Sequence, residues 1–348
     1  MTSSSPTFAE TLKAIESTEG LSAVLARRAF DAVLSGTWTQ AQIAGFLIAL
    51  RSRGESAEVI VAAAESMRAT MVRVQHSFEL VMDTCGTGGD GHGTINLSTA
   101  AAIVLAASGV VVAKHGNRAV SSRAGSADVL EALGIALGLE AATTGDVLNE
   151  VGITFMLAPS HHPAMRHAMP VRRDLGVRTI FNCLGPLANP AGATHQLIGA
   201  FSDAIRPVMA ETLRHLGTKR AWVVFGSDGL DEVSPFTSTH VSETGPHGVT
   251  SFEIAPEDFG IARSPAGAIA GGDRVENARA LTAIFDNQPH PAVDAVVLNA
   301  AAGFVVAEEL SPKAAAAKAR EVIASGAALH KLSDWVRVSC AAKAKTAT

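Results

Sequence analysis

The pattern of apolar and polar positions divides the chain into a helical N-terminal part and a longer part of mixed pattern. Between residues 6 and 72, apolar side chains recur at helical spacing, for example at Ile43, Phe46, Leu47 and Leu50. Capping and breaking residues predict helix starts at Pro6, Leu21, Thr39 and Ser56 and stops at Gly20, Gly36 and Gly54. We therefore expect a small helical module whose apolar positions form a core or a subunit interface.

From about residue 78, short β-branched runs alternate with helical segments. The runs "FELVMD", "VVVAK" and "ITFML" are separated by helical patterns at 98–108 and 126–133. "RAWVVFG", a hairpin around "ETGPHGV" and helical patterns at 272–285 and 311–332 continue the alternation, and only the tail "AAKAKTAT" is expected to be disordered. This alternation predicts an α/β fold with a mostly parallel sheet.

Composition narrows the class of protein. The 348 residues allow two domains, and the formal net charge of −5 does not favour bulk attraction to nucleic acid or anionic membrane. Cys85, Cys183 and Cys340 are isolated, which argues against a zinc site or a disulfide framework. The most apolar run, residues 100–113, is too short to span a bilayer, and the first residues lack a secretion signal. We expect a cytoplasmic protein whose phosphate binding, if any, is local.

The stretch "MDTCGTGGDG" places Gly86, Gly88 and Gly91 on the G-x-G-x-x-G spacing of a phosphate-binding turn. Alone, this spacing most often marks an ordinary turn. A dinucleotide site also needs an acidic residue roughly 20 positions later, but no Asp or Glu lies between Asp90 and Asp128. Ser98 is expected to cap the helix that follows and to direct its N–H groups at the same place. A phosphate group therefore suits this turn better than a dinucleotide.

Polar and basic residues follow the next predicted strand. In "VVVAKHGNRAVSSRAGSAD", hydrogen-bond donors gather at Lys114, His115, Asn117, Arg118, Ser121, Ser122 and Ser126. Ligands of open α/β sheets bind at the carboxyl ends of the strands, where this cluster and the glycine turn would meet. The motive for a cation at this strand end is anion binding rather than packing. Together the two clusters predict a highly charged phosphate site.

A third cluster is acidic. "RAWVVFGSDGLDE" places Asp228, Asp231 and Glu232 in a glycine-containing loop after a strand. Mg²⁺ takes one or two carboxylates and completes its shell with water and substrate phosphates. The same residues are common in ordinary solvated turns, so both interpretations stay open at this point.

Five segments, taken in order, resemble the anthranilate phosphoribosyltransferase family of tryptophan biosynthesis: "GTGGDG", "NLSTA", "KHGNRAVSSRAGSADVLEALG", "RTIFNCLGPLANPAG" and "DGLDE". The resemblance implies a homodimer in which a small α-helical domain, 1–73, is joined by a returning helical segment around 170–192. A larger α/β domain, 74–348, of the nucleoside phosphorylase and phosphoribosyltransferase type, would enclose the cleft. The implied ligands are phosphoribosyl diphosphate, Mg²⁺ and anthranilate.

The resemblance also implies roles for individual residues. Lys114, Asp231 and Glu232 would be the catalytic residues, and Ser98, Asp231 and Glu232 would bind Mg²⁺. Anthranilate would contact Gly86, Asn117 and Arg172, with Arg173 as the alternative to Arg172. Phosphoribosyl diphosphate would contact Gly86, Gly89, Asp90, Thr94, Asn96, Leu97, Ser98, Thr99, Lys114, His115, Gly116, Asn117, Arg118, Ala119, Val120, Ser121, Ser122 and Ser126.

The histidines and two rival functions complete the expectations. His161, His162 and His167 lack metal-binding spacing and are expected to cover the entrance to the aromatic site, while His115 orients its loop.

A pyrimidine nucleoside phosphorylase would have "KHS" followed by glycines in place of "KHGNRAVSS". A nucleic-acid-binding relative without transferase activity would need a basic surface, which the net charge of −5 does not suggest.

Overall fold

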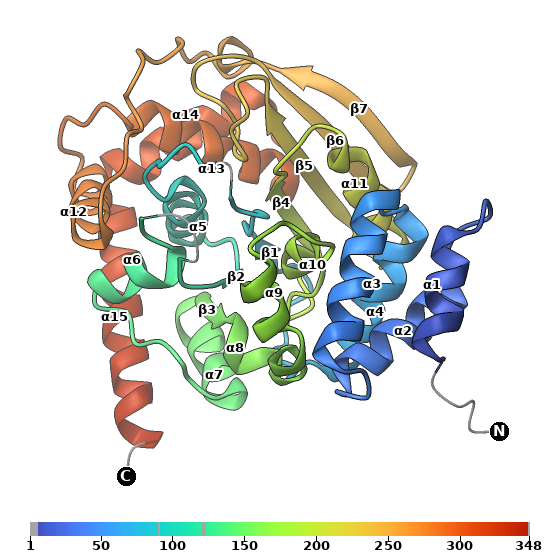
Figure 1. Ribbon diagram of the computed structural model, residues 1–348. Helices are drawn as coiled ribbons and strands as arrows, with labels where there is room; N and C mark the ends of the chain where they lie inside the picture. The colour runs from blue at the N-terminus through green and yellow to red at the C-terminus, as the bar shows by residue number, and fades with distance from the viewer. Residues whose placement is uncertain (1–5, 90, 120–122, 347–348) are drawn as a thin grey trace.

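The computed structural model describes residues 6–89, 91–119 and 123–346. The N-terminal part consists of four helices, α1 (Phe8–Glu16), α2 (Ala23–Leu34), α3 (Gln40–Arg53) and α4 (Ala57–Thr70), grouped at one side of the molecule (Figure 1). The hydroxyls of Thr7, Ser22, Thr39 and Ser56 accept backbone N–H bonds at the helix starts. The predicted helix starts are thus confirmed to within two residues.

A seven-stranded sheet in the order β3-β2-β1-β4-β5-β6-β7 forms the centre of the remaining chain. The strands are β1 (Met82–Asp83), β2 (Val112–Gly116), β3 (Ile153–Leu157), β4 (His195–Gly199), β5 (Arg220–Gly226), β6 (Thr239–Gly245) and β7 (Gly248–Ile254). The first five are parallel, and β6 and β7 form an antiparallel hairpin at one edge. The mostly parallel sheet and the hairpin are confirmed, whereas the central strand β4 was not predicted.

The helices that connect and cover these strands are α5 (Leu97–Ala107), α6 (Ser126–Ala132), α7 (Ala141–Val151), α8 (Ala158–His161), α9 (Met169–Leu175), α10 (Phe181–Leu187), α11 (Ile205–His215), α12 (Arg274–Phe285), α13 (Val293–Glu308), α14 (Pro312–Ala324) and α15 (Ala327–Thr346), with two 3₁₀ turns, η1 (Pro163–His167) and η2 (Pro256–Phe259). The expected disordered tail is wrong for residues 341–346, which continue α15. One large core joins α5, α13, α14 and α15 to the sheet.

The helical bundle does not have a core of its own. Its apolar side chains merge with those of η1, α9, α10 and α11 and with one face of β4 and β5. Phe30 meets Phe46 and Phe181 edge to face, with ring centroids 5.2 and 6.1 Å apart. The segment 163–188 therefore connects the bundle physically to the sheet. No helix within the described ranges is long and apolar enough to cross a membrane.

Candidate active site

The glycine loop after β1 and the acidic loop after β5 meet at the carboxyl end of the sheet, although β4 lies between the two strands. The acidic loop folds across the end of β4, where a Cβ on Gly199 would lie 1.5 Å from the carbonyl oxygen of Asp231. The backbone N–H of Thr87 donates to the Gly199 carbonyl at 2.8 Å. A Cβ on Gly86 would lie 3.6 Å from Oδ2 of Asp231. Glycine at position 199 is thus what permits the two loops to approach.

Three side chains predicted for the site converge at the start of α5. The backbone N–H of Ser98 donates to Oε1 of Glu232 at 3.1 Å, and Nζ of Lys114 donates to Oγ of Ser98 at 3.3 Å. The expectation that Ser98 caps this helix is wrong, because Asn96 occupies the N-cap position and makes no side-chain capping bond. A carboxylate from the acidic loop satisfies the helix start instead, which suits the positive end of the helix dipole.

Lys114 is buried, with 2% of its surface exposed. Its ammonium group also donates to the carbonyl oxygen of Thr84 at 2.8 Å and to the Thr84 hydroxyl at 3.2 Å. The expectation that this cation has no part in packing is therefore wrong. Lys114 connects β2, which continues beyond it to Gly116, to the glycine loop and to α5, because a buried cation needs such partners.

The loop after β2 folds back onto the start of α6. The Arg118 guanidinium pairs with Asp128 at 3.1 Å and Glu131 at 3.0 Å, and these two hydrogen-bonded carboxylates raise its pKa. The N–H groups of Ala119 and Gly125 donate to Oδ2 of Asp128 at 2.9 and 3.0 Å. The cation of Arg118 thus has acidic partners within the protein. Asp90, Val120, Ser121 and Ser122, also predicted for the site, lie outside the described residues.

The other predicted contacts surround the glycine loop. Thr94 bridges to Ala270, and Oδ1 of Asn96 accepts from Asn277 at 3.0 Å. Leu97 and Thr99 are buried at the start of α5, and the Thr99 hydroxyl has no hydrogen-bond partner among the described residues. Four predicted contacts remain. Gly89 lies in the glycine loop, Gly116 is the last residue of β2, Asn117 begins the loop after it, and Ser126 is the first residue of α6.

Asp228 differs from the two acids that follow it. Its Oδ2 accepts from the Ser234 hydroxyl at 2.7 Å, and its Oδ1 accepts from the Leu230 N–H at 3.3 Å. These bonds close the acidic loop on itself, as turn aspartates do. Of the three predicted acids, the contacts therefore relate only Asp231 and Glu232 to the glycine loop and α5.

A buried polar layer lies beneath the site and was missed by the sequence analysis. The Asp83 carboxylate is fully buried, accepts from the His115 N–H at 3.1 Å and accepts from Nδ2 of Asn189 at 2.7 Å. Burial raises the pKa of Asp83 to about 6, while the charge of Lys114 and these hydrogen bonds oppose the rise. The available clue was an acid at the end of an apolar run, directly before the glycine loop.

The histidines lie deeper than expected. His161 and His162 are 1% and 3% exposed, so the expectation that they cover an entrance is wrong for both. The ring of His115 lies 5.0 Å from that of His162, and its Nδ1 is 2.9 Å from the Gly185 carbonyl oxygen. Burial lowers the pKa of His115 to about 4 and that of His162 to about 3. Both rings are therefore neutral at physiological pH.

This burial predicts acid sensitivity. Between pH 6.5 and 5, the unfolded chain takes up a proton at residue 162 that the folded chain does not, so stability falls as the pH falls, by about 2 kcal/mol for this ring at pH 5. In His162→Gln, the loss of unfolding free energy between pH 7 and pH 5, measured by urea unfolding, should be smaller by about that amount. His247→Gln, in the exposed turn after β6, controls for the substitution. Equal losses in wild type and His162→Gln would contradict the prediction.

The two arginines considered for the aromatic substrate differ in their surroundings. Arg172, on α9, is half-buried, and its guanidinium lies 5.6 Å from the ring centroid of Phe181. Burial lowers the pKa of Arg172. Arg173 is exposed. Helix α9 packs against α3 of the bundle, so Arg172 lies on the side of the molecule where the bundle meets the α/β part.

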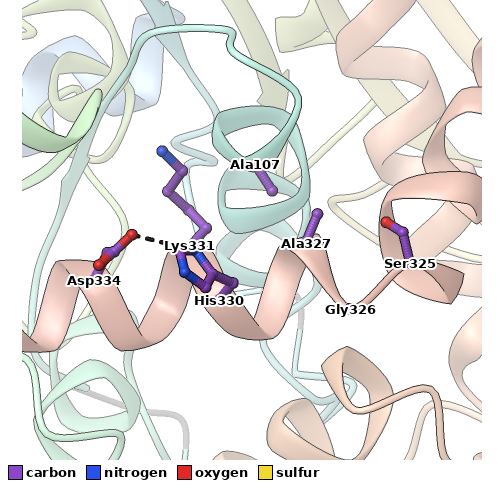
Figure 2. A pocket seen from close by; sticks show the side chains of 7 residues that line it. All are labelled: Ala107, Ser325, Gly326, Ala327, His330, Lys331 and Asp334. Carbon is purple, nitrogen blue, oxygen red and sulfur yellow. Dashed lines mark ion pairs between the residues drawn. The ribbon is translucent and has the colours of Figure 1, made fainter.

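A surface hollow far along α5 is separate from these loops. Figure 2 shows its lining, which includes Ala107, the last residue of α5, and Ser325 to Ala327 before and at the start of α15. His330 pairs with Asp334 at 3.3 Å, and Nζ of Lys331 donates to the Val151 carbonyl at 2.9 Å. The site loops meet the opposite end of α5, so the hollow has no part in the arrangement described above.

Comparison with known proteins agrees with this fold. Residues 9–71 match the helical bundle domain of a glycosyl transferase family, and residues 79–329 match its a/b domain. The chain is thus a glycosyl transferase of the class that combines these two domains.

The relatives narrow this class. Anthranilate phosphoribosyltransferase of Rhodospirillum rubrum is 50% identical over 319 residues, 91% of this chain and 92% of the relative. That of Rhodopseudomonas palustris strain CGA009 is 48% identical over 315 residues, 90% and 93% of the two chains. The crystal structure of the Thermus thermophilus enzyme superposes with a TM-score of 0.88 at 43% identity, covering 95% and 98% of the chains. This chain belongs to the anthranilate phosphoribosyltransferase family.

A solved structure from Saccharomyces cerevisiae bears on the ligands of that family. It is an anthranilate phosphoribosyltransferase in complex with phosphoribosyl diphosphate and Mg²⁺, with a TM-score of 0.88, 28% identity and coverage of 96% and 98% of the two chains. Another structure of the yeast enzyme contains 4-fluoroanthranilate.

Proposed function

We propose that this chain transfers the 5-phosphoribosyl group from phosphoribosyl diphosphate to the amine of anthranilate, giving N-(5-phosphoribosyl)anthranilate and diphosphate in tryptophan biosynthesis. The observation that supports this most directly is the convergence of Lys114, Ser98 and Glu232 at the start of α5. Family membership supports the same reaction. The glycine loop would receive the phosphates, because its backbone N–H groups can approach them closely.

Ser98, Asp231 and Glu232 would hold Mg²⁺ together with the substrate. Within residues 6–89, 91–119 and 123–346, no cluster of three or more His, Cys, Asp or Glu side chains could hold a metal ion alone. Two carboxylates and a hydroxyl nevertheless fit Mg²⁺, which usually takes its remaining ligands from water and substrate phosphates. Bound there, Mg²⁺ would neutralise negative charge on the departing diphosphate.

Groups of the protein itself would stabilise the leaving diphosphate and position the attacking amine. Breaking the anomeric C–O bond leaves negative charge on the diphosphate, and Lys114 and the N–H groups around the glycine loop would stabilise it. An aryl amine is neutral at pH 7, so it can attack without a base that removes a proton first. Holding the amine behind the anomeric carbon would complete the rate enhancement. Gly86, Asn117 and Arg172 are the proposed contacts of anthranilate.

The two arginines of α9 give a matched test of the anthranilate site. Arg172→Ala should raise the KM for anthranilate about tenfold or more and that for phosphoribosyl diphosphate less than threefold, because a guanidinium binds a carboxylate strongly. Arg173→Ala, the exposed neighbour, is the control and should leave both constants near wild type. Steady-state kinetics with each substrate varied measure this. A large effect confined to Arg173→Ala would transfer the role to that residue.

The proposed reaction is tested by the loss of anthranilate fluorescence when phosphoribosyl diphosphate and Mg²⁺ are added to the purified protein. Consumption of anthranilate with release of diphosphate supports the proposal. Cleavage of thymidine by phosphate without metal, and no consumption of anthranilate, would favour a pyrimidine nucleoside phosphorylase. A shift of single-stranded DNA in a gel, with neither activity, would favour the nucleic-acid-binding alternative.

The assembly, compartment and domain division also belong to the proposal. We propose a cytoplasmic homodimer with a helical domain at 1–73, joined by a returning segment around 170–192, and an α/β domain at 74–348. The packing of η1, α9 and α10 into the core of the bundle supports the returning segment. Sedimentation of the purified protein would test the dimer.

A further inference from the structure

Two buried charges lie beneath the proposed active site. Among the Asp, Glu, Lys and Arg residues that the structure describes, only Asp83 and Lys114 are buried, with 0% and 2% of their surface exposed. Burying a carboxylate is costly unless it gains a cation and hydrogen bonds. The glycine loop begins immediately after Asp83, and Lys114 ends in contact with that loop. The free-energy cost of burying these two charges therefore falls where the elements proposed to bind phosphate meet.

The Asp83 carboxylate links three segments that are distant in sequence. Its Oδ1 accepts from the backbone N–H of His115 at 3.1 Å. His115 is the residue directly after Lys114. Its Oδ2 accepts from Nδ2 of Asn189 at 2.7 Å, and the same amide donates to the Ala113 carbonyl at 2.9 Å. Oδ1 of Asn189 in turn accepts from the Ala191 N–H at 2.9 Å. Every polar atom of this pair thus has a defined partner.

The same linkage reaches the segment that connects the bundle to the sheet. Asn189 follows α10, and the Gly185 carbonyl within α10 lies 2.9 Å from Nδ1 of His115. The Asp83–Asn189 pair thereby fixes the two neighbours of Lys114 in the chain, which are Ala113 and His115. Since well-satisfied buried polar networks specify one arrangement of the chain, this pair fixes the backbone of β2 on both sides of Lys114, just before the loop that begins at Asn117.

We propose that Asp83, paired with Asn189, is a positioning residue. It fixes the backbone on both sides of Lys114, and thereby places the Lys114 side chain and the loop after β2 in the geometry that receives phosphoribosyl diphosphate. The inference rests on the function proposed above. In this arrangement Asp83 cannot touch either substrate, because its side chain is fully buried beneath the glycine loop. It acts through the backbone of His115 and through the charge it presents to Lys114.

Asp83→Asn tests the proposal, because both groups facing residue 83 are donors and an amide can accept from only one of them. We expect the Kd for phosphoribosyl diphosphate with Mg²⁺, measured by calorimetry, and its KM to rise about tenfold. The KM for anthranilate at saturating co-substrate should change less than about twofold. A Kd equal to that of wild type would overturn the proposal.

The exchanged pair provides a rescue. Asp83→Asn combined with Asn189→Asp keeps one carboxylate and one amide in contact, at the cost of the bond to the Ala113 carbonyl. The double variant should bind phosphoribosyl diphosphate within about threefold of wild type. A double variant no tighter than Asp83→Asn would exclude the pair as the positioning element. If Asp83→Asn does not fold, Asn189→Ala decides: a Kd raised about threefold or more supports the proposal and an unchanged Kd overturns it.

Ser339→Ala is the control for a merely structural effect. Ser339 is buried on α15, and its hydroxyl accepts from the Ala136 N–H at 3.1 Å, away from the site loops. This variant should lower the thermal midpoint and leave the Kd for phosphoribosyl diphosphate unchanged. An Asp83→Asn variant that behaves in the same way would overturn the proposal. Calorimetry decides the matter even if the wild-type protein binds phosphoribosyl diphosphate without consuming anthranilate, which would refute only the proposed function.

Discussion

Replacing Lys114 with methionine is expected to weaken the binding of phosphoribosyl diphosphate about 10- to 100-fold, because a charge-assisted contact contributes roughly 1.5–3 kcal/mol. Methionine keeps most of the length of the side chain and removes its charge. The free energy of unfolding should also fall, by about 1–3 kcal/mol, since the oxygens of Thr84 and Ser98 lose their buried donor and the Asp83 carboxylate loses the favourable charge of Lys114. Calorimetry with the substrate and urea unfolding measure the two effects on one protein.

A second substitution separates these effects. Adding Asp83→Asn to Lys114→Met removes both buried charges, so part of the lost stability should return even though the amide can accept from only one of the two donors at residue 83. The affinity for phosphoribosyl diphosphate should stay low. Lys13→Met on the exposed surface of α1 is the control for loss of a lysine. Recovery of affinity in the double variant, or wild-type affinity in Lys114→Met, would contradict the role of Lys114 in binding the anion.

Local chemistry made the helical bundle and most strands predictable. The cap hydroxyls of Ser22, Thr39 and Ser56 each satisfy a helix start within a few residues of sequence. Strand β4 was missed because it is short and begins with His195 and Gln196, although Gln196 is buried and donates to the Pro186 carbonyl at 2.7 Å. A polar side chain with a buried partner removes the apolar pattern by which such a strand is recognised.

Helix α13 was missed for the opposite reason. Every residue from Ala295 to Ala307 is buried, so the helix has no polar face and its sequence shows no helical period. The sequence between the two predicted helical patterns at 272–285 and 311–332 therefore contains no recognisable element. Only the packing of α13 against α5 and α14 reveals why so apolar a segment is needed there.

The sequence could predict those parts of the site whose position depends on where the parallel strands end. The sequence placed Lys114 at the end of a strand and so predicted its meeting with the glycine loop, because parallel strands end at one edge of a sheet. In the structure the strand continues two residues further, to Gly116. The burial of Lys114 was not predictable, since it depends on Asp83 and Asn189, which lie 106 residues apart. Arg118 likewise reads as a free cation in the sequence but pairs with Asp128 and Glu131 in the folded chain. Such ion pairs form through tertiary contacts, so the local sequence pattern does not predict them.

The largest loss of activity is expected from replacing the two acids of the loop after β5 that adjoin the glycine loop and α5. Asp231→Asn with Glu232→Gln preserves side-chain size and removes two charges, so turnover should fall on the order of a hundredfold or more, and half-maximal rate should require a higher Mg²⁺ concentration. The Glu232 bond to the Ser98 N–H can still form, because the glutamine side chain retains an acceptor oxygen. Chelation should abolish the activity of the wild-type protein.

Asp228→Asn is the matched control, because Asp228 lies in the same loop and its carboxylate closes the turn through Ser234 and Leu230. It should lower stability modestly, by about 1 kcal/mol for a weakened turn bond, and leave the Mg²⁺ requirement unchanged. If the acids only shape the loop, all three substitutions will act alike on stability and none will shift the Mg²⁺ curve. The decisive measurement is transferase rate against Mg²⁺ concentration for wild type, Asp228→Asn and the double variant, and superimposable curves would refute metal binding by Asp231 and Glu232.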